Sequence, residues 1–306
     1  MAGLPTRSLG NTGEEVSILA MGGGHVATLK NPSAEVIRII QYAIDQGVTF
    51  MDNAWEYSSG RSEVLMGEAI QSRRDELFLM TKVCSRDRKG AEKELEESLR
   101  RFHTDRIDLW QFHEINYAND HEWIFAPGGA AEAAEAALKA GKVRYVGFTG
   151  HKDPEYMLSM LQYDFPWTTA QFPVNVLDPC YRSFIRQLLP ELQKRNIAAL
   201  GMKAVGGRGQ IITEAGFTPA ECLNFALSQP ISCLVSGMDS IEIVDQNVKI
   251  AREFKPLSEE EQSALVERGR AVASDGRYEW FKSTPYFDSK HHRNQHGFPE
   301  TLVSSG

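Results

Sequence analysis

Four polar residues close or follow apolar stretches of the sequence. They are Asp52 and Tyr57 in "FMDNAWEY", Lys82 at the end of "FLMTK", and His113 at the end of "IDLWQFH". A buried ammonium group is costly unless it is paired, so Lys82 needs an acidic partner or a chemical task. Asp52 supplies that partner if the two stretches are neighbours. Because a nearby ammonium group favours the phenolate, we predict a lowered pKa for Tyr57 and acid–base work by its hydroxyl.

A repeating pattern of strand and helix must position these residues. Eight short apolar runs rich in β-branched residues alternate with helical patterns, at residues 16–21, 50–54, 78–83, 107–113, 143–149, 169–174, 197–202 and 232–238. Three runs begin at residues 50, 78 and 107, and intervals of 28 and 29 residues fit one strand plus one crossover helix. The pattern predicts a closed (β/α)8 TIM barrel over about residues 14–256. A doubly wound open sheet is the alternative, but no G-x-G-x-x-G follows the first run.

Additions are expected at both ends of the barrel. The stretch "TRSLGNTGEEVSIL" places a turn at residues 11–13, which predicts an N-terminal β-hairpin over the barrel floor. Ser258 and Glu261 have the spacing of a capping box, so an extra C-terminal helix should begin there. The helix and a polar tail would occupy residues 257–306, with the tail over one face of the barrel. We treat residues 1–306 as a single domain.

Composition excludes several classes of partner. The 33 basic and 41 acidic residues give a net charge of −8, which disfavours binding to nucleic acid or to an anionic membrane surface. No apolar run has the length of a secretory signal or a membrane anchor, so we expect a cytoplasmic protein. The 4 cysteines form no C-x-x-C pair, and we predict no metal site.

The tetrad and its flanking motifs resemble those of the aldo-keto reductases. Barrel enzymes carry catalytic groups where strands end, which is where Asp52, Tyr57, Lys82 and His113 fall. The resemblance covers nearly the whole chain and includes "RSLGNTGEEVSILAMGGG", "DNAWEYSSGRSE", "GKVRYVGFTGH", "QFPVN", "MKAVGGRG" and "SGMDSIEIVDQN". It implies reduction of an aldehyde or ketone by hydride from a nicotinamide cofactor, or the reverse oxidation. Tyr57 would be the general acid/base, Lys82 and Asp52 its electrostatic support, and His113 the donor that orients the carbonyl oxygen.

The resemblance also assigns the cofactor contacts. Asp52 should touch the nicotinamide ribose, while Thr149 and Gln171 should hold the carboxamide. The remaining contacts would come from Met202, Lys203, Gly207, Gly237, Met238, Gln246 and Asn247. Asp239 and Ile243 stand where relatives often grip a 2′-phosphate with basic or polar groups. Family habit favours NADP (NADPH), and NAD is possible.

The substrate and the role of the protein leave alternatives. His25, Trp55 and Trp123 would wall a pocket for a small-molecule carbonyl or alcohol, hydrophobic or sugar-like. One alternative is a nucleotide-binding regulatory or sensor protein on the same fold. Another is a barrel lyase with a Schiff base on Lys82, which requires that lysine to be accessible and free of Asp52. The physiological substrate, the working direction and the oligomeric state stay open.

Overall fold

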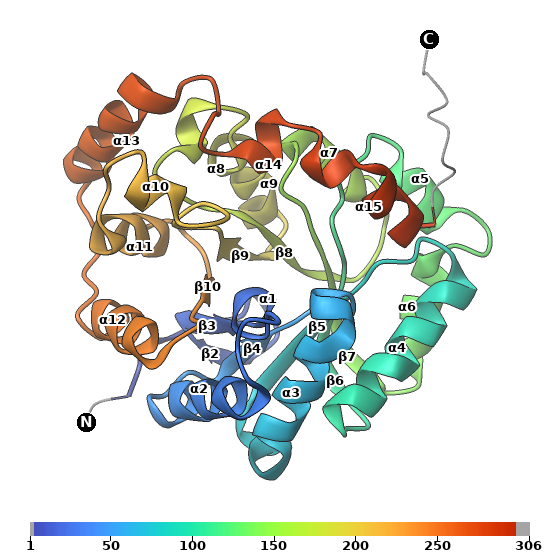
Figure 1. The fold of residues 1–306 in the computed structure, drawn as a ribbon. Helices are drawn as coiled ribbons and strands as arrows, with labels where there is room; N and C mark the ends of the chain where they lie inside the picture. Colours follow the sequence, from blue (N-terminus) through green and yellow to red (C-terminus); the bar gives the residue numbers. More distant parts are fainter. Residues whose placement is uncertain (1–2, 298–306) are drawn as a thin grey trace.

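The computed structural model describes residues 3–297 and contains a closed barrel of eight parallel strands ringed by helices (Figure 1). The strands are β3 (Leu19–Gly22), β4 (Phe50–Asp52), β5 (Phe78–Val83), β6 (Ile107–Phe112), β7 (Val143–Thr149), β8 (Trp167–Pro173), β9 (Ala198–Met202) and β10 (Cys233–Gly237). Each strand pairs with its neighbour in the sequence, and β10 pairs with β3 to close the ring. The predicted barrel is therefore confirmed, and the open sheet is wrong.

Helices of the outer ring follow successive strands. They are α2 (Ser33–Asp45), α3 (Arg61–Ile70), α4 (Arg88–Phe102), α6 (Ala130–Lys139), α7 (Pro154–Met160), α8 (Phe184–Gln187), α9 (Leu189–Lys194), α11 (Pro219–Ser228) and α12 (Ile241–Arg252). In α2, Val36, Ile40 and Ala43 recur on one face and are buried, as the spacing of the sequence dictates. Shorter turns connect these elements, namely α1 (Gly23–Val26), η1 (Tyr57–Gly60), η2 (Gln71–Glu76), α5 (Asp120–Phe125), η3 (Asp178–Cys180) and α10 (Gln210–Thr213).

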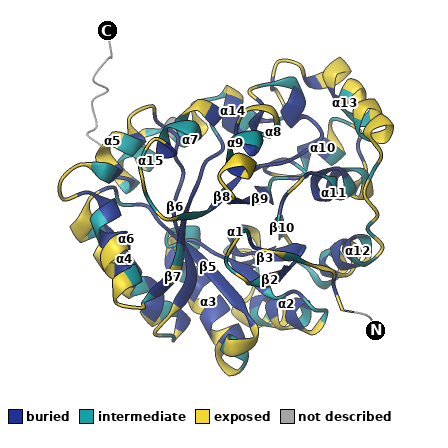
Figure 2. Cartoon of the chain, turned by 180° about the vertical axis from the view of Figure 1, so that it is seen from behind, coloured by how far each residue is buried: buried dark blue, intermediate teal, exposed yellow. Residues whose placement is uncertain are grey.

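The strands are buried on both faces, and the outward faces of the helices are exposed (Figure 2). A large apolar cluster lies between strands and helices, and a smaller one fills the lower barrel, where the rings of Phe50 and Phe78 are 5.0 Å apart. Side chains two residues apart in a strand point the same way, so Asp52 and Lys82 also face the interior, above this aromatic layer. The floor thus stays apolar, and the charged residues gather at the carboxyl ends of the strands.

The N-terminal hairpin closes the barrel floor, as predicted. Strand β1 (Thr6–Ser8) pairs antiparallel with β2 (Glu15–Ser17). Leu9 and Val16 belong to the apolar cluster inside the lower barrel, so the hairpin acts as its plug. The run predicted as one strand at residues 16–21 is therefore divided, because its first residues pair in the hairpin and only its later residues enter the barrel.

The C-terminal segment packs against the carboxyl-end face of the barrel (Figure 1). Helix α13 (Glu259–Ala273) begins at the predicted capping box of Ser258 and Glu261. It is followed by α14 (Trp280–Ser283), η4 (Tyr286–Asp288) and α15 (Lys290–Gln295). Lys282 anchors this segment, because its Nζ lies 2.6 Å from Asp178 Oδ1 and 2.9 Å from Glu279 Oε1 in a fully buried cluster. The rest of the predicted tail, residues 298–306, lies outside the described residues.

Within residues 3–297, no helix combines the length and the apolar character needed to cross a membrane.

Candidate active site

Asp52 and Lys82 form a buried ion pair at the carboxyl ends of β4 and β5. Lys82 Nζ lies 2.5 Å from Asp52 Oδ1, and the two side chains are only 1% and 3% exposed. The same ammonium donates to the backbone oxygen of Asn53 at 2.7 Å, while Gln171 Nε2 donates to Asp52 Oδ2 at 2.6 Å. The structure thus supplies the partner that a buried lysine requires.

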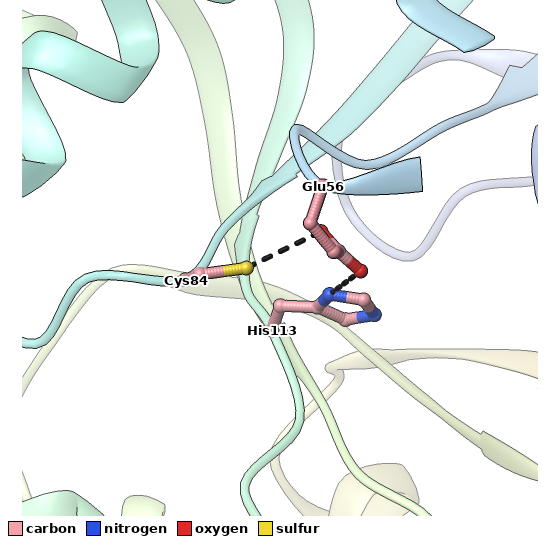
Figure 3. A group of neighbouring side chains, drawn as sticks. All are labelled: Glu56, Cys84 and His113. Carbon is pink, nitrogen blue, oxygen red and sulfur yellow. Dashed lines mark hydrogen bonds and ion pairs between the residues drawn. The ribbon is translucent and has the colours of Figure 1, made fainter. Parts of the chain in front are cut away.

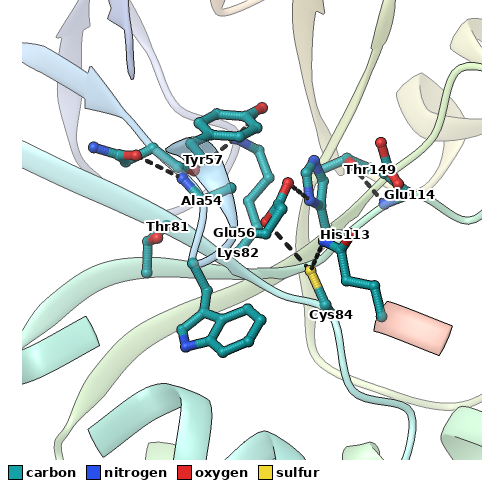
Figure 4. A network of polar contacts seen from close by, with 12 residues as sticks. Ala54, Glu56, Tyr57, Thr81, Lys82, Cys84, His113, Glu114 and Thr149 are labelled. Atoms are coloured by element: carbon teal, nitrogen blue, oxygen red, sulfur yellow. Dashed lines mark hydrogen bonds and ion pairs between the residues drawn. The ribbon is translucent and has the colours of Figure 1, made fainter. Parts of the chain in front are cut away.

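Tyr57 lies directly above this pair. Its hydroxyl oxygen is 3.5 Å from Lys82 Nζ, and the ammonium is 5.0 Å from the centre of the phenol ring (Figure 4). The turn that carries the tyrosine continues through Ser58 and Ser59, which have positive φ angles of 53° and 57°. Such left-handed backbone is costly for residues other than glycine and concentrates at functional sites. The position of the phenol is therefore fixed by a strained turn.

The direction of the Tyr57 pKa differs from the sequence prediction. Burial, together with the negative charges of Asp52, Glu56 and Glu114, raises the pKa of Tyr57 well above its ordinary value of 10.0. The prediction of a lowered pKa is wrong, because it counted the ammonium of Lys82 but neither the loss of solvent nor the two glutamates. Consequently the phenol carries its proton at neutral pH and can donate it.

His113 lies beside Tyr57 and contacts a residue that the sequence analysis missed. The rings of Tyr57 and His113 are 5.7 Å apart and nearly perpendicular. His113 Nδ1 lies 2.8 Å from Glu56 Oε1, and Cys84 Sγ donates to Glu56 Oε2 at 3.2 Å (Figure 3). Burial lowers the pKa of His113, although Glu56 opposes this effect. The signal for Glu56 was a charged residue directly before the catalytic-type tyrosine in "DNAWEY".

Glu56, Cys84 and His113 also have the side-chain types of a metal site. Their ligand atoms all lie within 4.8 Å of one another, and zinc accepts oxygen, sulfur and nitrogen ligands. The separations of 2.8 and 3.2 Å are, however, those of direct contacts between the side chains. The arrangement is that of a polar network in which each group already engages its neighbour.

Two further ionisable residues, Glu114 and Lys203, flank the tetrad. Burial raises the pKa of Glu114 to about 8, and burial lowers the pKa of Lys203 to about 8. The C-terminal segment covers this lysine, because its Nζ lies 5.1 and 5.4 Å from the ring centres of Phe281 and Phe287. Both Glu114 and Lys203 have positive φ angles, of 54° and 56°. Strained backbone thus recurs at the ends of β6 and β9, as it does beside Tyr57.

Thr149 and Gln171 lie side by side at the ends of β7 and β8. Gln171 Oε1 is buried and has no hydrogen-bond partner among residues 3–297. Thr149 Oγ1 accepts from the backbone nitrogen of Glu114 at 3.1 Å, so its hydroxyl hydrogen is left to donate. Together the two side chains offer one acceptor and one donor, which matches the amide nitrogen and oxygen of a carboxamide.

The glycine loops after β9 and β10 are joined by His25, which had been predicted to line the substrate pocket. His25 Nε2 lies 3.1 Å from the backbone oxygen of Gly207, and a Cβ placed on Gly237 would lie 3.0 Å from His25 Nδ1. A Cβ on Gly207 would lie 2.8 Å from the ring of Trp280, so no larger residue fits. Met202, which precedes this loop at the end of β9, is partly buried. His25 therefore belongs with the residues assigned to the cofactor.

The other residues assigned to the nucleotide differ in accessibility. Met238 is fully buried in the apolar core, so it can reach a ligand only through its backbone. Asn247 Nδ2 donates to Ser236 Oγ at 3.0 Å and ties α12 to β10. Gln246 is exposed and donates to Asn247 Oδ1 at 3.2 Å. These residues define the shape of the loop, and Gln246 is the member with an exposed side chain.

The two tryptophans predicted for the substrate pocket have other surroundings. Trp55 Nε1 donates to Glu97 Oε2 at 2.8 Å, and the guanidinium of Arg101 lies 5.5 Å from its ring, so its polar edge is held by α4. Trp123 lies on α5 and is 41% exposed. Of the three residues predicted for the substrate pocket, His25 therefore contacts the glycine loops, Trp55 contacts α4, and Trp123 is exposed on α5.

Comparison with known proteins agrees with the fold. A model of the "Aldo/keto reductase family" matches residues 18–215. The chain belongs to this family. L-galactose dehydrogenase of Arabidopsis thaliana is 24% identical over 86% of this chain and 93% of its own length. Aldo-keto reductase YhdN of Bacillus subtilis is 31% identical over 63% of this chain and 60% of its own. An aldo/keto reductase from Klebsiella pneumoniae, solved with NADP and acetate, superposes with a TM-score of 0.71 at 23% identity, over 86% and 95% of the two chains.

Membership of the aldo/keto reductases confirms the resemblance drawn from the tetrad motifs and supports an oxidoreductase activity. The lyase alternative requires an accessible, unpaired Lys82. Because this lysine is 1% exposed and bonded to Asp52, the structure does not meet that condition.

Proposed function

We propose that this protein is an NAD(P)H-dependent oxidoreductase that interconverts a small carbonyl compound and its alcohol, with Tyr57 as the general acid/base. The observation that carries the proposal is the Asp52–Lys82 pair, closed at 2.5 Å, with its ammonium 3.5 Å from the Tyr57 hydroxyl and His113 beside it. The names of two relatives, L-galactose dehydrogenase and Aldo-keto reductase YhdN, support the same class of reaction.

The residues at the barrel mouth fit a nicotinamide cofactor. Gln171 and Thr149 would hold the carboxamide, and Asp52 has unused lone pairs with which to accept from the ribose. Lys203 and the Gly207 loop would face the pyrophosphate. When bound, the nicotinamide supplies or accepts the hydride that no side chain can provide. We favour NADP, which the structure of the Klebsiella relative contains, with NAD as the alternative.

The side chains of the tetrad would manage the proton. A raised pKa keeps Tyr57 protonated, so its hydroxyl can donate to the carbonyl oxygen of a substrate. As that proton leaves, the ammonium of Lys82 stabilises the growing negative charge on the phenol oxygen. Asp52 stays paired with Lys82, and His113 offers a second hydrogen-bonding group to the substrate oxygen. A general acid placed in this way contributes a factor of about 10² to 10⁴ in rate.

The substrate we propose is polar, in the manner of a sugar or another hydroxylated carbonyl. Glu56, Cys84 and Glu114 all lie near enough to Tyr57 for their charges to affect its pKa. Such groups hydrogen-bond with hydroxyls, and the ionised carboxylate of Glu56 repels a substrate that carries a carboxylate. This favours the sugar-like reading of the sequence over the hydrophobic one.

The test is a panel of carbonyl compounds with each cofactor. Oxidation of NADPH and of NADH is followed by absorbance with sugars, hydroxyaldehydes, aliphatic aldehydes and keto acids. We expect turnover of hydroxylated carbonyls, faster with NADPH than with NADH and slowest with keto acids. Tyr57→Phe should lose this turnover. Its matched control is Tyr145→Phe, which removes a phenol hydroxyl near the barrel floor and should leave turnover unchanged. Binding of either cofactor without turnover of any compound would replace the proposal with the sensor alternative.

A further inference from the structure

The carboxylate of Glu56 contacts one ring nitrogen of His113. Its Oε1 lies 2.8 Å from His113 Nδ1, a close electrostatic contact that falls outside hydrogen-bond geometry, and the two side chains are 19% and 6% exposed. Its other oxygen accepts from Cys84 Sγ at 3.2 Å, and Cys84 Sγ in turn accepts from Gln295 Nε2 at 3.2 Å. Because both carboxylate oxygens are engaged, the carboxylate is fixed in the orientation that faces Nδ1. Residues from three separate elements build this arrangement, namely the turn after β4, the end of β5 and helix α15.

The carboxylate determines where the imidazole carries its proton. A neutral imidazole has one N–H and one lone pair, whereas an ionised carboxylate can only accept. A bare Nδ1 would therefore lie 2.8 Å from a negatively charged oxygen of Glu56, which places the proton on Nδ1 and the lone pair on Nε2. Burial lowers the pKa of His113, and despite burial the contact with His113 lowers the pKa of Glu56. A neutral ring beside an ionised carboxylate is consistent with both directions.

We propose that Glu56 is a positioning residue that holds a proton on Nδ1 of His113. In the neutral ring, Nε2 can then accept a hydrogen bond from an alcohol. Nε2 can donate a hydrogen bond to a carbonyl only when the ring is doubly protonated. This inference rests on the proposed function, since it concerns how His113 meets the reacting oxygen. It also revises the role implied by the family resemblance, in which His113 is a carbonyl donor. In this chain, carbonyl binding by His113 is linked to the uptake of one proton, whereas the alcohol complex needs none.

Other charges also act on His113, and they do not share one sign. The groups that affect it, or are affected by it, are Asp52 on β4, Glu56 in the following turn, Lys82 on β5, His151 after β7, and His292 and His296 of the C-terminal segment. Tyr57 and Cys84 also lie close to it. Lys82 disfavours a charged ring, while Glu56 and Asp52 favour it. Glu56 is the partner in direct contact with a ring nitrogen, so it decides which nitrogen is protonated first.

Nitrogen NMR of the wild-type protein tests the tautomer directly. Protein labelled with ¹⁵N-histidine is measured at pH 8 with NADP present, and the His113 signals are assigned by their loss in His113→Asn. We expect Nδ1 to be bonded to hydrogen and Nε2 to have the shift of a bare ring nitrogen. A ring protonated on Nε2 and bare on Nδ1 would overturn the proposal, and this result does not depend on whether any carbonyl is turned over.

Kinetics of Glu56→Met separate a positioning role from a structural one. In the wild type, kcat/KM for carbonyl reduction should fall about tenfold per pH unit above the pKa of His113. In Glu56→Met, a neutral ring can carry its proton on Nε2, so the decline should become shallow. Glu96→Met, on the outer surface of α4, is the matched control and should keep the wild-type profile. If kcat/KM fell equally steeply with pH in the wild type and in Glu56→Met, the proposal would be contradicted. Absence of any carbonyl turnover by the wild type would contradict only the proposed function.

Discussion

Replacing Lys82 with methionine removes the ammonium and keeps most of the apolar stem. Asp52 is then left buried with Gln171 as its remaining side-chain donor, at 2.6 Å. Because both members of the pair are at most 3% exposed, solvent cannot take over the lost interaction. Removing one partner of a buried pair typically costs about 3–5 kcal/mol. We expect Lys82→Met to lower the free energy of unfolding by this amount, and Tm by roughly 5–8 °C.

A double variant separates the unpaired charge from lost packing. In Asp52→Asn/Lys82→Met both charges are absent, so the double variant should regain most of the stability lost in Lys82→Met. We expect a coupling free energy of about 2 kcal/mol or more from urea denaturation of the wild type, both single variants and the double variant. Lys249→Met, on the exposed face of α12, should denature like the wild type. Additive effects of the two single substitutions would refute the reasoning.

Three further predictions concern the C-terminal segment, the mouth of the barrel and the cofactor. Lys282→Met leaves Asp178 and Glu279 buried without their cation, so hydrogen exchange over residues 280–295 should accelerate at least tenfold. Unchanged exchange would show that the cluster does not anchor the segment. Burial raises the pKa of Glu114 from an ordinary 4.5 to about 8. Between these pH values the folded state keeps a proton that the unfolded state loses, so the wild type should lose stability as pH rises. Glu114→Gln should lack this loss and gain a few kcal/mol over the wild type between pH 5 and pH 9 in urea denaturation; equal pH dependence of the two proteins would count against the buried carboxyl. Gln171→Leu should weaken NADPH binding by roughly 5- to 100-fold in a fluorescence titration, and unchanged affinity would remove Gln171 from the cofactor site.

The barrel could be predicted from the sequence because its information is local. The runs at residues 78–83 and 143–149 match β5 and β7 in both bounds, since apolar residues predominate in each although each contains one basic residue, Lys82 or Arg144. Parallel strands of a barrel also fix which residues meet at its carboxyl-end face. The pairing of Asp52 with Lys82 follows from the alternation of side chains along two neighbouring strands.

The electrostatics of the site could not be predicted in this way. The pKa of Tyr57 depends on Glu56 and Glu114, which reach it from two separate loops, and on burial that the sequence does not reveal. The role of Glu56 likewise depends on the conformation of its side chain, which places the carboxylate beside His113. The hydrogen bond from Trp55 to Glu97 of α4 likewise joins two segments far apart in the sequence, which the sequence does not reveal.

The rate of hydride transfer in a single turnover tests the central claim most directly. Wild type and Tyr57→Phe are each saturated with NADPH, mixed with a carbonyl that the wild type reduces, and followed by the loss of cofactor absorbance. The account predicts equal affinity for NADPH and a rate lowered by about 10² to 10⁴ in Tyr57→Phe, because the proton donor above Lys82 is gone. Equal rates in the two proteins would contradict it.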